Sequence, residues 1–321
     1  MSPEEWRRLP REEKNRLRRE KHERRRAERA AGSSQRFVPS ANPIAWKHCK
    51  SGKFFSRDLS TLNLSTLYQG SSCFLVSCGP SLLQTDLSQL NRRGVLTCGI
   101  NNSPTVFRTN LWVFGDPPYK FHDAIWKDPA ITKFVPLSFL STNPIREKTA
   151  NGFEWLGRPG HLYPQDMPNV IGYRRSGRLD AKTFLTEDSI SFGRSEKHAK
   201  REKLPHINNT FFSVIKVLYS IGVRTIYLLG CDFKMSPMQP YAFGQQKSDG
   251  GVRSNNRSYA RMNDWFVSAR PTFEAAGLRI FNCTPESGLT AFERVDYLDA
   301  VTACTGHVPQ DPLDARGWYQ L

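Results

Sequence analysis

The chain has 321 residues and a formal net charge of +16, from 46 Lys and Arg residues against 30 Asp and Glu residues. This length allows one large domain or two modest ones, with an ample core either way. No apolar run approaches the roughly 20 residues that span a bilayer and the N-terminus lacks the apolar core of a secretion signal, so we expect a soluble, cytoplasmic protein without a transmembrane segment. The basic balance favours polyanions such as nucleic acid, an anionic membrane or phosphorylated substrates, without choosing among them.

Residues 1–40 form a basic arm and linker. Within it, residues 4–31 mix Arg and Glu at helical spacings with almost no apolar stripe, which fits a solvated helix or a disordered tail. The alternative is an arm whose arginines neutralise phosphates, either of nucleic acid or of the inner face of a membrane. Residues 41–70 are a lead-in segment to which the sequence assigns no structure.

Residues 71–304 carry the pattern of an α/β domain. Short apolar runs at 74–77, 95–100 and 111–114 predict three strands, each ending in a polar loop, with a helix-length connection between the first two. A short helix within 119–133 and a fourth strand at 134–140 follow. Strands that alternate with helical segments predict a parallel sheet, and ligands of such sheets bind where the carboxyl ends of the strands meet their loops.

Residues 141–204 are polar and rich in Gly, Pro and Arg, without clear periodicity. So long a stretch predicts a lid or insertion. Some of its side chains could meet a phosphate or an acidic substrate, or could simply face solvent: Tyr163, Tyr173, Arg174, Arg175, Arg178 and Arg194.

Helical apolar spacing returns at 210–221, with Asn208, Asn209 or Thr210 as the expected N-cap. A buried strand follows at 225–229 and leads into Asp232 at its carboxyl end. We further expect a loop at 235–251, a helix at 258–276, a strand at 278–282 and a short helix near 291–298. The tail at 305–321 shows no pattern.

The seven cysteines are an odd number without metal-ligand spacing, and four of them (73, 78, 98 and 231) fall in predicted strands or at their ends. Buried free thiols are therefore expected. The sequence contains no Walker motif, no GxGxxG loop and no D-x-D pair, so the usual P-loop and dinucleotide sites lack support. No metal site and no prosthetic group are expected.

Five short motifs occur in a set order, each at a strand-to-loop junction: SCGPSL, GINN, GDPP, IYLLGCDF and PYAF. In this order they resemble the bacterial sialyltransferases that use CMP-sialic acid to decorate lipooligosaccharide. They are also similar to a wider superfamily that includes archaeal pterin pyrophosphokinases. The resemblance spans about residues 73–300, with little to match at 141–204. It implies a Rossmann-like, mostly parallel sheet flanked by helices, as in a GT-A-like single nucleotide-binding domain with a polar lid.

The resemblance also assigns donor contacts. The backbone of Ser77, Cys78 and Gly79 would approach the phosphate or ribose of a nucleotide-sugar co-substrate, and Ser81 would cap the next helix. Within the following loops, nucleotide or phosphate contacts would come from Asn101, Asn102, Asp116 and Thr210. Taken singly, each of these residues could instead serve only a turn or a cap.

The leaving phosphate would be held after the strand that ends at Asp232. Two tyrosines do this in the sialyltransferases; here Tyr241 matches the second, and Lys234 stands in place of the first. A lysine can stabilise a leaving phosphate by its charge. Cys78 also departs from the family, which has Asn at that position.

The base of the family is a histidine just before the penultimate helix, but residues 249–264 contain none. Transfer to a hydroxyl normally needs a base within hydrogen-bond reach. The candidates are His161, His198, His206 and Asp264, of which His206 is favoured because it lies just before the 208–210 cap.

Three functions remain open. The first is a metal-independent glycosyltransferase that moves a sugar from a nucleotide-activated, perhaps CMP-linked, donor to an acceptor hydroxyl. The second is a pyrophosphokinase or other phosphoryl transferase, which would need ATP and Mg²⁺, with Asp116 and Asp232 as candidate metal ligands. The third is a transferase that modifies DNA or RNA bases, or a nucleic-acid-binding protein, guided by the basic arm; a lipid-linked acceptor at an anionic membrane explains the same charge.

Overall fold

The computed structural model describes residues 51–141 and 162–308, some isolated positions (Pro10, Glu13, Arg16, Glu20, Cys49, Ile145 and Gln310) and the backbone of strands β7 (Glu147–Thr149) and β8 (Gly152–Glu154). The predicted basic arm, the linker and most of the C-terminal tail lie outside these residues, and so does His161.

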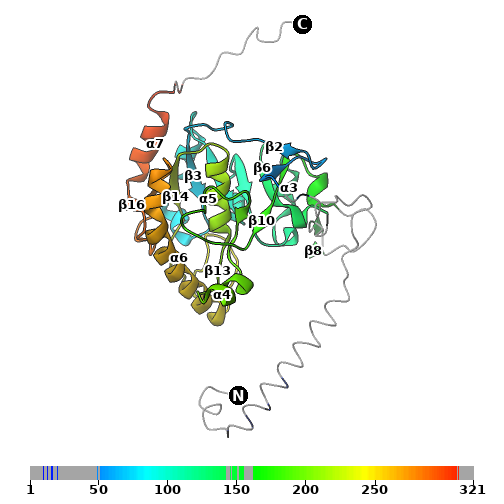
Figure 1. The fold of residues 1–321 in the computed structure, drawn as a ribbon. Coiled ribbons are helices and arrows are strands. Elements are labelled where there is room, and N and C mark those ends of the chain that lie inside the picture. Colours follow the sequence, from blue (N-terminus) through cyan, green and yellow to red (C-terminus); the bar gives the residue numbers. More distant parts are fainter. Residues whose placement is uncertain are drawn as a thin grey trace.

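A ten-stranded, mostly parallel sheet forms the centre of the molecule (Figure 1). Its order is β16-β15-β14-β3-β4-β5-β6-β9-β1-β2, and every pair from β16 to β9 is parallel. The four strands expected at 74–77, 95–100, 111–114 and 134–140 are confirmed, with small shifts, as β3 (Ser72–Val76), β4 (Thr97–Ile100), β5 (Leu111–Val113) and β6 (Thr132–Pro136).

Later parts of the chain supply the other side of the sheet. The strands expected at 225–229 and 278–282 are β14 (Thr225–Leu229) and β15 (Arg279–Asn282), with β16 (Glu293–Arg294) at the edge. The helix expected at 210–221 is α5 (Thr210–Ser220), and Asn209 is its N-cap because its side chain accepts a hydrogen bond from the amide of Phe211. The long helix α6 (Asp249–Ala275) begins earlier than predicted, and the last helix, α7 (Tyr297–Thr305), begins later.

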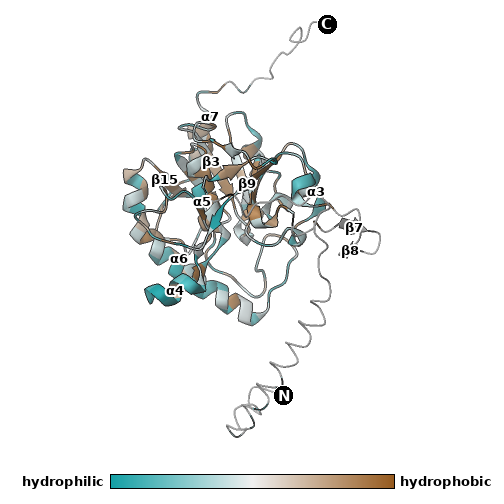
Figure 2. Cartoon of the chain, turned by 45° about the vertical axis from the view of Figure 1, so that its right-hand side comes forward, coloured by the Kyte–Doolittle hydropathy of each residue, from teal (hydrophilic) through white to brown (hydrophobic). Residues whose placement is uncertain are grey.

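Helices cover both faces of the sheet. Alternate residues of β3 point to opposite faces: Cys73 and Leu75 pack in the cluster that contains α5 and α6, whereas Phe74 and Val76 pack with α7. In β5, Trp112 packs on the side of α3 (Asp123–Lys127). Figure 2 shows the strands as largely hydrophobic and α4 (Glu196–Glu202) as hydrophilic. Burial on both faces explains why these strands are continuous apolar runs in the sequence.

Two sequence expectations need correction, and one segment left unassigned gains a structure. Val170–Tyr173 (β9) lies inside the main sheet between β6 and β1, so this part of the predicted 141–204 insertion belongs to the sheet. The unassigned lead-in segment supplies the antiparallel strands β1 (Phe54–Phe55) and β2 (Thr61–Leu62), of which β2 lies at the edge of the sheet. The connection from β3 to β4 consists of two 3₁₀ helices, Pro80–Gln84 and Leu87–Asn91, rather than one α-helix.

Two small two-stranded sheets lie within residues 175–208, apart from the main sheet. One pairs β10 (Arg175–Ser176) with β11 (Ile190–Ser191), and the other pairs β12 (Gly193–Arg194) with β13 (Ile207–Asn208). All seven cysteines are free thiols, and Cys73, Cys98 and Cys231 are buried as expected. Among the described residues, no helix has the length and apolar character that crossing a membrane requires.

Candidate functional site

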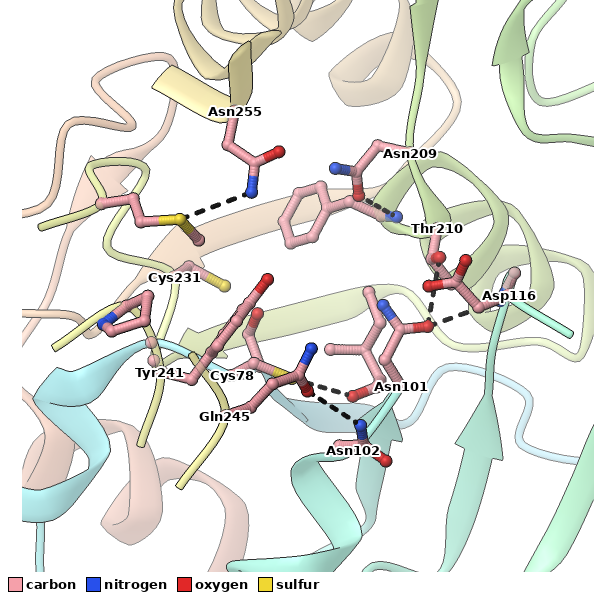
Figure 3. Close-up of a pocket in the computed structure, with 18 of the residues that line it drawn as sticks. Cys78, Asn101, Asn102, Asp116, Asn209, Thr210, Cys231, Tyr241, Gln245 and Asn255 are labelled. Carbon is pink, nitrogen blue, oxygen red and sulfur yellow. Dashed lines mark hydrogen bonds between the residues drawn. The ribbon is translucent and has the colours of Figure 1, made fainter. Parts of the chain in front are cut away.

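The strand order reverses at the middle of the sheet. After β3 the chain continues to one side through β4, β5 and β6, whereas after β14 it continues to the other side through β15. Loops that diverge from two adjacent parallel strands leave a crevice at the carboxyl ends, which is where ligands of open α/β sheets bind. A cavity of about 1000 Å³ lies at this point (Figure 3). That volume is at the upper end of the range of small-molecule sites.

The loops after β3 and β14 are tied together at the base of the cavity. Ser81 donates a hydrogen bond from its Oγ to Asp232 Oδ2 at 2.9 Å, and the amide of Gly79 donates to the carbonyl of Gly230 at 2.9 Å. A Cβ atom on Gly79 would lie 1.6 Å from Asp232 Oδ2, so only glycine fits there. Gly79 is the N-cap position of the following 3₁₀ helix, and the prediction that Ser81 caps it is wrong.

Asn101 joins three elements around the cavity. It adopts a left-handed conformation with φ of 51°, which Asn tolerates better than most residues. Its Oδ1 accepts hydrogen bonds from Thr210 Oγ1 at 3.2 Å and from the amide of Gly115 at 3.4 Å. With Oδ1 engaged in this way, the amide nitrogen of Asn101 is the group that can donate to a ligand (Figure 3).

The first turn of α5 forms another wall. Thr210 is the first residue of this helix, and Asn208, Asn209 and Phe211 line the cavity with it. The amino end of an α-helix carries a partial positive charge, which favours an anion, although Asn209 already accepts hydrogen bonds from the amides of Phe211 and Phe212. A side chain on Gly115 would collide with Thr210 Oγ1 and Phe192, so β5 can end this close to α5 only at a glycine.

The loop after β14 closes the other side. The amide of Ala242 donates to the carbonyl of Cys78 at 3.0 Å, and Tyr241 stacks on Phe243 with ring centroids 5.3 Å apart. Gln245 accepts a hydrogen bond from Asn102 Nδ2 at 3.4 Å. These contacts hold Tyr241 against the loops of β3 and β4.

The cavity is lined by more cations than anions. The cationic side chains are Lys120, Arg175, Lys234 and Lys247, and the carboxylates are Asp116 and Asp232. Lys120 pairs with Asp116 at 2.8 Å, and Lys234 lies 3.6 Å from the exposed carboxylate of Glu286. A cavity with this balance attracts anionic ligands.

Burial shifts the pKa of several groups around the cavity. Desolvation raises the pKa of the Asp232 carboxyl, and the hydrogen bond from Ser81 and the charge of Lys234 oppose this effect. Desolvation also raises the pKa of the Cys78 thiol to about 12 and that of the Tyr259 hydroxyl. Cys78 is therefore a neutral thiol at physiological pH, which donates a hydrogen bond to the carbonyl of Ile100, and not a nucleophile.

The structure brings together all of the predicted site residues except two. Ser81 acts through Asp232, and His206 is exposed and is not among the residues that line the cavity. His198 bonds to Ser195, and neither it nor Asp264 lines the cavity. The sequence-based choice of His206 fails because this residue lies just before β13 (Ile207–Asn208) with its side chain exposed, so its nearness in sequence to the 208–210 cap does not bring it to the cavity.

Sequence reasoning missed His122, which among the described histidines is the one that lines the cavity. Its Nδ1 lies 3.1 Å from the amide of Ala124 and 3.1 Å from Asp123 Oδ1. The sequence did hold one hint of its role: His122 lies six residues after Asp116, in the segment that follows the same strand, β5. The aromatic residues Phe139 and Phe192 also line the cavity and carried no sequence signal.

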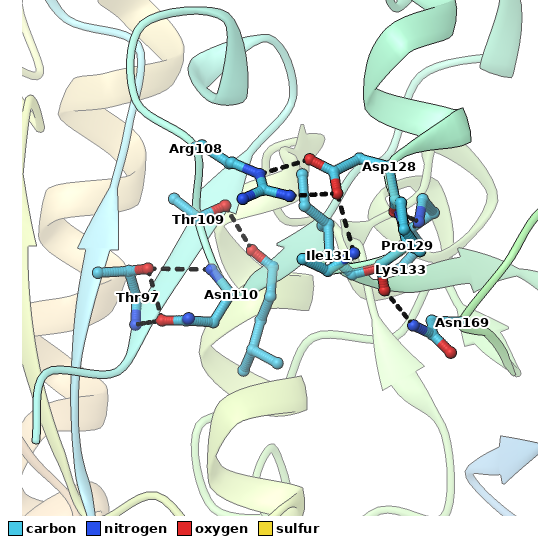
Figure 4. Close-up of polar contacts among 11 residues, drawn as sticks. Thr97, Arg108, Thr109, Asn110, Asp128, Pro129, Ile131, Lys133 and Asn169 are labelled. Atoms are coloured by element: carbon cyan, nitrogen blue, oxygen red, sulfur yellow. Dashed lines mark hydrogen bonds and ion pairs between the residues drawn. The ribbon is translucent and has the colours of Figure 1, made fainter. Parts of the chain in front are cut away.

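The amino ends of the same strands carry similar residue types that bond to one another instead (Figure 4). Asn110 Oδ1 accepts from the amide and hydroxyl of Thr97 at 2.9 and 2.8 Å, and Arg108 forms a two-pronged ion pair with Asp128 at 2.6 and 2.7 Å. Lys133 Nζ donates to three carbonyls within 3.0 Å. The polar groups at this end are structural, which sets them apart from those at the carboxyl ends.

Within the described residues, no group of three or more His, Cys, Asp and Glu side chains is arranged to hold a metal ion. Comparisons with protein-family models, with curated proteins and with solved structures found no match to this chain.

Proposed function

We propose that the protein is a glycosyltransferase that takes its sugar from a nucleotide-activated donor, with a nucleoside monophosphate as the leaving group and without a metal ion. The observation that carries this proposal is the cavity at the reversal of strand order, where the Ser77–Gly79 backbone, the amino end of α5 and the side chain of Lys234 surround one space. The partial positive charge of the helix end and the charge of Lys234 favour a phosphate, whereas the amides of Ser77 and Gly79 already donate to the carbonyls of Leu229 and Gly230.

Under this proposal the domain is Rossmann-like, and the residues after β9, 174–204, act as a lid over the donor. Support comes from the position of Arg175 and Phe192, which lie in this segment and line the cavity. The phosphate would lie between the loop after β3 and the first turn of α5, with Asn101 donating to the nucleotide. Lys234 and Tyr241 would stabilise the negative charge of the departing phosphate.

His122 is our candidate for the general base. It lines the cavity, and its Nδ1 accepts a hydrogen bond from the amide of Ala124. In the neutral ring the proton is then on Nε2, and Nδ1 carries the lone pair that can accept a proton. In the reaction the acceptor oxygen would bond to the anomeric carbon, and the bond from this carbon to the phosphate oxygen would break with its electron pair leaving on the phosphate. The hydroxyl proton would go to His122 Nδ1, in place of the hydrogen bond from Ala124.

A phosphoryl transfer from ATP is the second candidate, favoured by one observation: Asp116 and Asp232 both line the cavity. Carboxylates from two strand ends are a common support for Mg²⁺ and its phosphates. In this structure each carboxylate is engaged, Asp116 by Lys120 and Asp232 by Ser81, so a metal would have to compete with those bonds.

The test is a binding screen of the full chain against CMP, UDP, GDP and ATP compounds, followed by turnover of those nucleotide sugars that bind. We expect nucleoside monophosphate to be released from a nucleotide sugar in the presence of EDTA. If no nucleotide sugar is bound or consumed with or without Mg²⁺, the glycosyltransferase proposal is wrong. Magnesium-dependent release of AMP from ATP with a pterin acceptor would establish the alternative.

A further inference from the structure

One half of the cavity has a wall that the donor contacts above do not use. This wall contains Phe139, Arg175 and Phe192, together with Gly115 at the end of β5. It stands on the side of β5, β6 and β9, away from Asp232 and Lys234 in the loop after β14.

Arg175 is held in this wall by two kinds of contact. Its Nη1 donates to the carbonyl of Gly115 at 3.0 Å, and its guanidinium carbon lies 4.0 Å from the ring centroid of Phe192. Phe139 lies farther away, at 5.8 Å. The stack fixes the plane of the guanidinium, while the other N–H groups of its planar fork have no hydrogen bond to another described residue.

The charges around the cavity distinguish Arg175 from its neighbours. Lys120 on the same side is paired with Asp116, and Lys234 on the opposite side is close to Glu286. Within the described part of the chain, no carboxylate lies within ion-pair distance of Arg175. A guanidinium that is stacked on a ring and open along one edge is suited to hold a carboxylate or phosphate by two parallel hydrogen bonds.

We propose that Arg175 binds a second anionic group, a carboxylate or a phosphate, on a substrate whose nucleotide phosphate occupies the β3, α5 and β14 side of the cavity. The proposal rests on the proposed function for the identity of that nucleotide. It specifies the substrate class further: the donor sugar or the acceptor is itself acidic. If Arg175 only tied β10 to the end of β5, its loss would affect charged and neutral substrates alike.

The first experiment compares the affinity of the full chain for UDP-glucose and UDP-glucuronate, which differ in one carboxylate, and for CMP and CMP-sialic acid. The variants are Arg175→Gln and Arg175→Lys, and the control is Arg253→Gln, which removes an exposed arginine on α6 that does not line the cavity. If the donor carries the anion, we expect Arg175→Gln to weaken binding of the acidic member by about 10- to 100-fold. The affinities of Arg175→Gln for UDP-glucose and CMP, and all affinities of the Arg253→Gln control, should change by less than about twofold. Arg175→Lys should restore only part of the loss because lysine lacks the planar fork.

A second experiment does not depend on nucleotide binding. Phenylglyoxal modification of Arg175 is followed by mass spectrometry with inorganic phosphate or acetate as the protecting anion, and Arg253 in the same sample is the reference. We expect at least about fivefold protection of Arg175 and none of Arg253, since only a built site binds these anions at millimolar concentration. Equal reactivity with and without the anions, or equal protection at both positions, would overturn the inference.

The outcomes separate the two proposals and the two sources of the anion. If no nucleotide binds but Arg175 is protected, the proposed function fails and the anion site stands. If nucleotides bind while Arg175 is neither protected nor needed for the acidic donor, the anion site is wrong and the proposed function stands. If Arg175 is protected with saturating nucleotide present and the donor pairs bind alike, the anion belongs to the acceptor.

Discussion

Ser81 Oγ donates a hydrogen bond to Asp232 Oδ2 at 2.9 Å, across 151 positions of sequence and across the point where the strand order reverses. The contact locks the loop after β3 to the loop after β14. It also keeps a carboxylate largely buried beside the cavity, where burial raises its pKa. Burying a carboxylate lowers the stability of the fold when the group is ionised, and buried ionisable groups with shifted pKa values are common in functional sites.

Replacing Asp232 by Asn should separate stability from function. Because the pKa of Asp232 is higher in the folded than in the unfolded chain, ionisation costs stability; the cost is absent at low pH and complete once the pH exceeds the folded-state value. We expect Asp232→Asn to raise the free energy of unfolding by on the order of 1 kcal/mol at pH 7, with no gain near pH 3. Nucleotide-sugar turnover should fall about 10- to 100-fold. Urea unfolding across this pH range measures the first effect, and a large loss of stability at pH 7 would contradict it.

Replacing Gly79 by Ala should damage the site through packing. The added methyl would lie 1.6 Å from Asp232 Oδ2 and 2.5 Å from the carbonyl of Gly230, so the two loops must separate. We expect a loss of about 1–3 kcal/mol of stability and loss of nucleotide binding. Gly244→Ala in the loop after β14 is the matched control, since no atom lies within 4 Å of its added methyl. Thermal unfolding and nucleotide titration measure both effects, and similar behaviour of the two variants would exclude this role for Gly79.

Replacing Asn101 by Asp tests the donor contact without disturbing the turn. Asp also tolerates the left-handed conformation and can accept the hydrogen bonds from Thr210 and Gly115, but it lacks the amide N–H groups. We expect the melting temperature to change by less than about 3 °C, while nucleotide affinity measured by calorimetry falls about 10- to 100-fold. Unchanged affinity would show that Asn101 serves only the turn.

Replacing His122 by Asn tests the proposed base. Asn is a good N-cap, so it should still accept the hydrogen bond from Ala124 at the start of α3. We expect turnover to fall about 10²- to 10⁴-fold while nucleotide affinity stays the same. The corresponding substitution of the exposed His206 should leave turnover unchanged. Wild-type turnover in His122→Asn, or a loss only in the His206 variant, would transfer the role away from His122.

Two fully buried lysines should respond in opposite directions to the same substitution. Lys216 Nζ has no hydrogen-bond partner in the described structure, and burial lowers its pKa to about 7. At pH 7 the Lys216 side chain is protonated in the unfolded chain but only partly protonated in the folded chain, so its ionisation favours unfolding. This loss of folding stability becomes smaller as the pH rises toward the pKa of the unfolded chain. We expect Lys216→Met to stabilise the fold at pH 7 by about 1–4 kcal/mol, with a smaller gain at pH 10.

Lys133 provides the contrast because its Nζ donates to the carbonyls of Asp128, Ile131 and Pro168. Lys133→Met removes the donor from all three, and we expect a loss of about 2–4 kcal/mol. Denaturant unfolding of both variants at pH 7 and pH 10 gives the comparison. Destabilisation by both, or by neither, would contradict the assignment of one lysine as unpaired and the other as structural.

Much of the fold could be predicted from local patterns. The strands at the centre of the sheet are continuous apolar runs ended by glycine, asparagine or aspartate, and both signals lie within a few residues of each other in the sequence. Strand β9 was missed because its pattern is interrupted by Gly172, and β1 and β2 because strands of two residues show no period. Their place in the sheet is set by pairing with distant strands.

By itself, the sequence determined that polar residues end the buried strands, since an apolar run must stop where a parallel strand leaves the core. That rule placed Cys78, Asn101, Asp116 and Asp232 at one edge of the sheet. Only the tertiary structure decided which side chains share the cavity, because Arg175, Phe192 and His122 reach it through loop paths and pairings that no local pattern encodes. It decided against His206 for a similar reason: His206 is an exposed loop residue just before β13, whereas Asn208 and Thr210, only two and four residues later, line the cavity. The path of a loop, and not nearness in sequence, sets where such a side chain points.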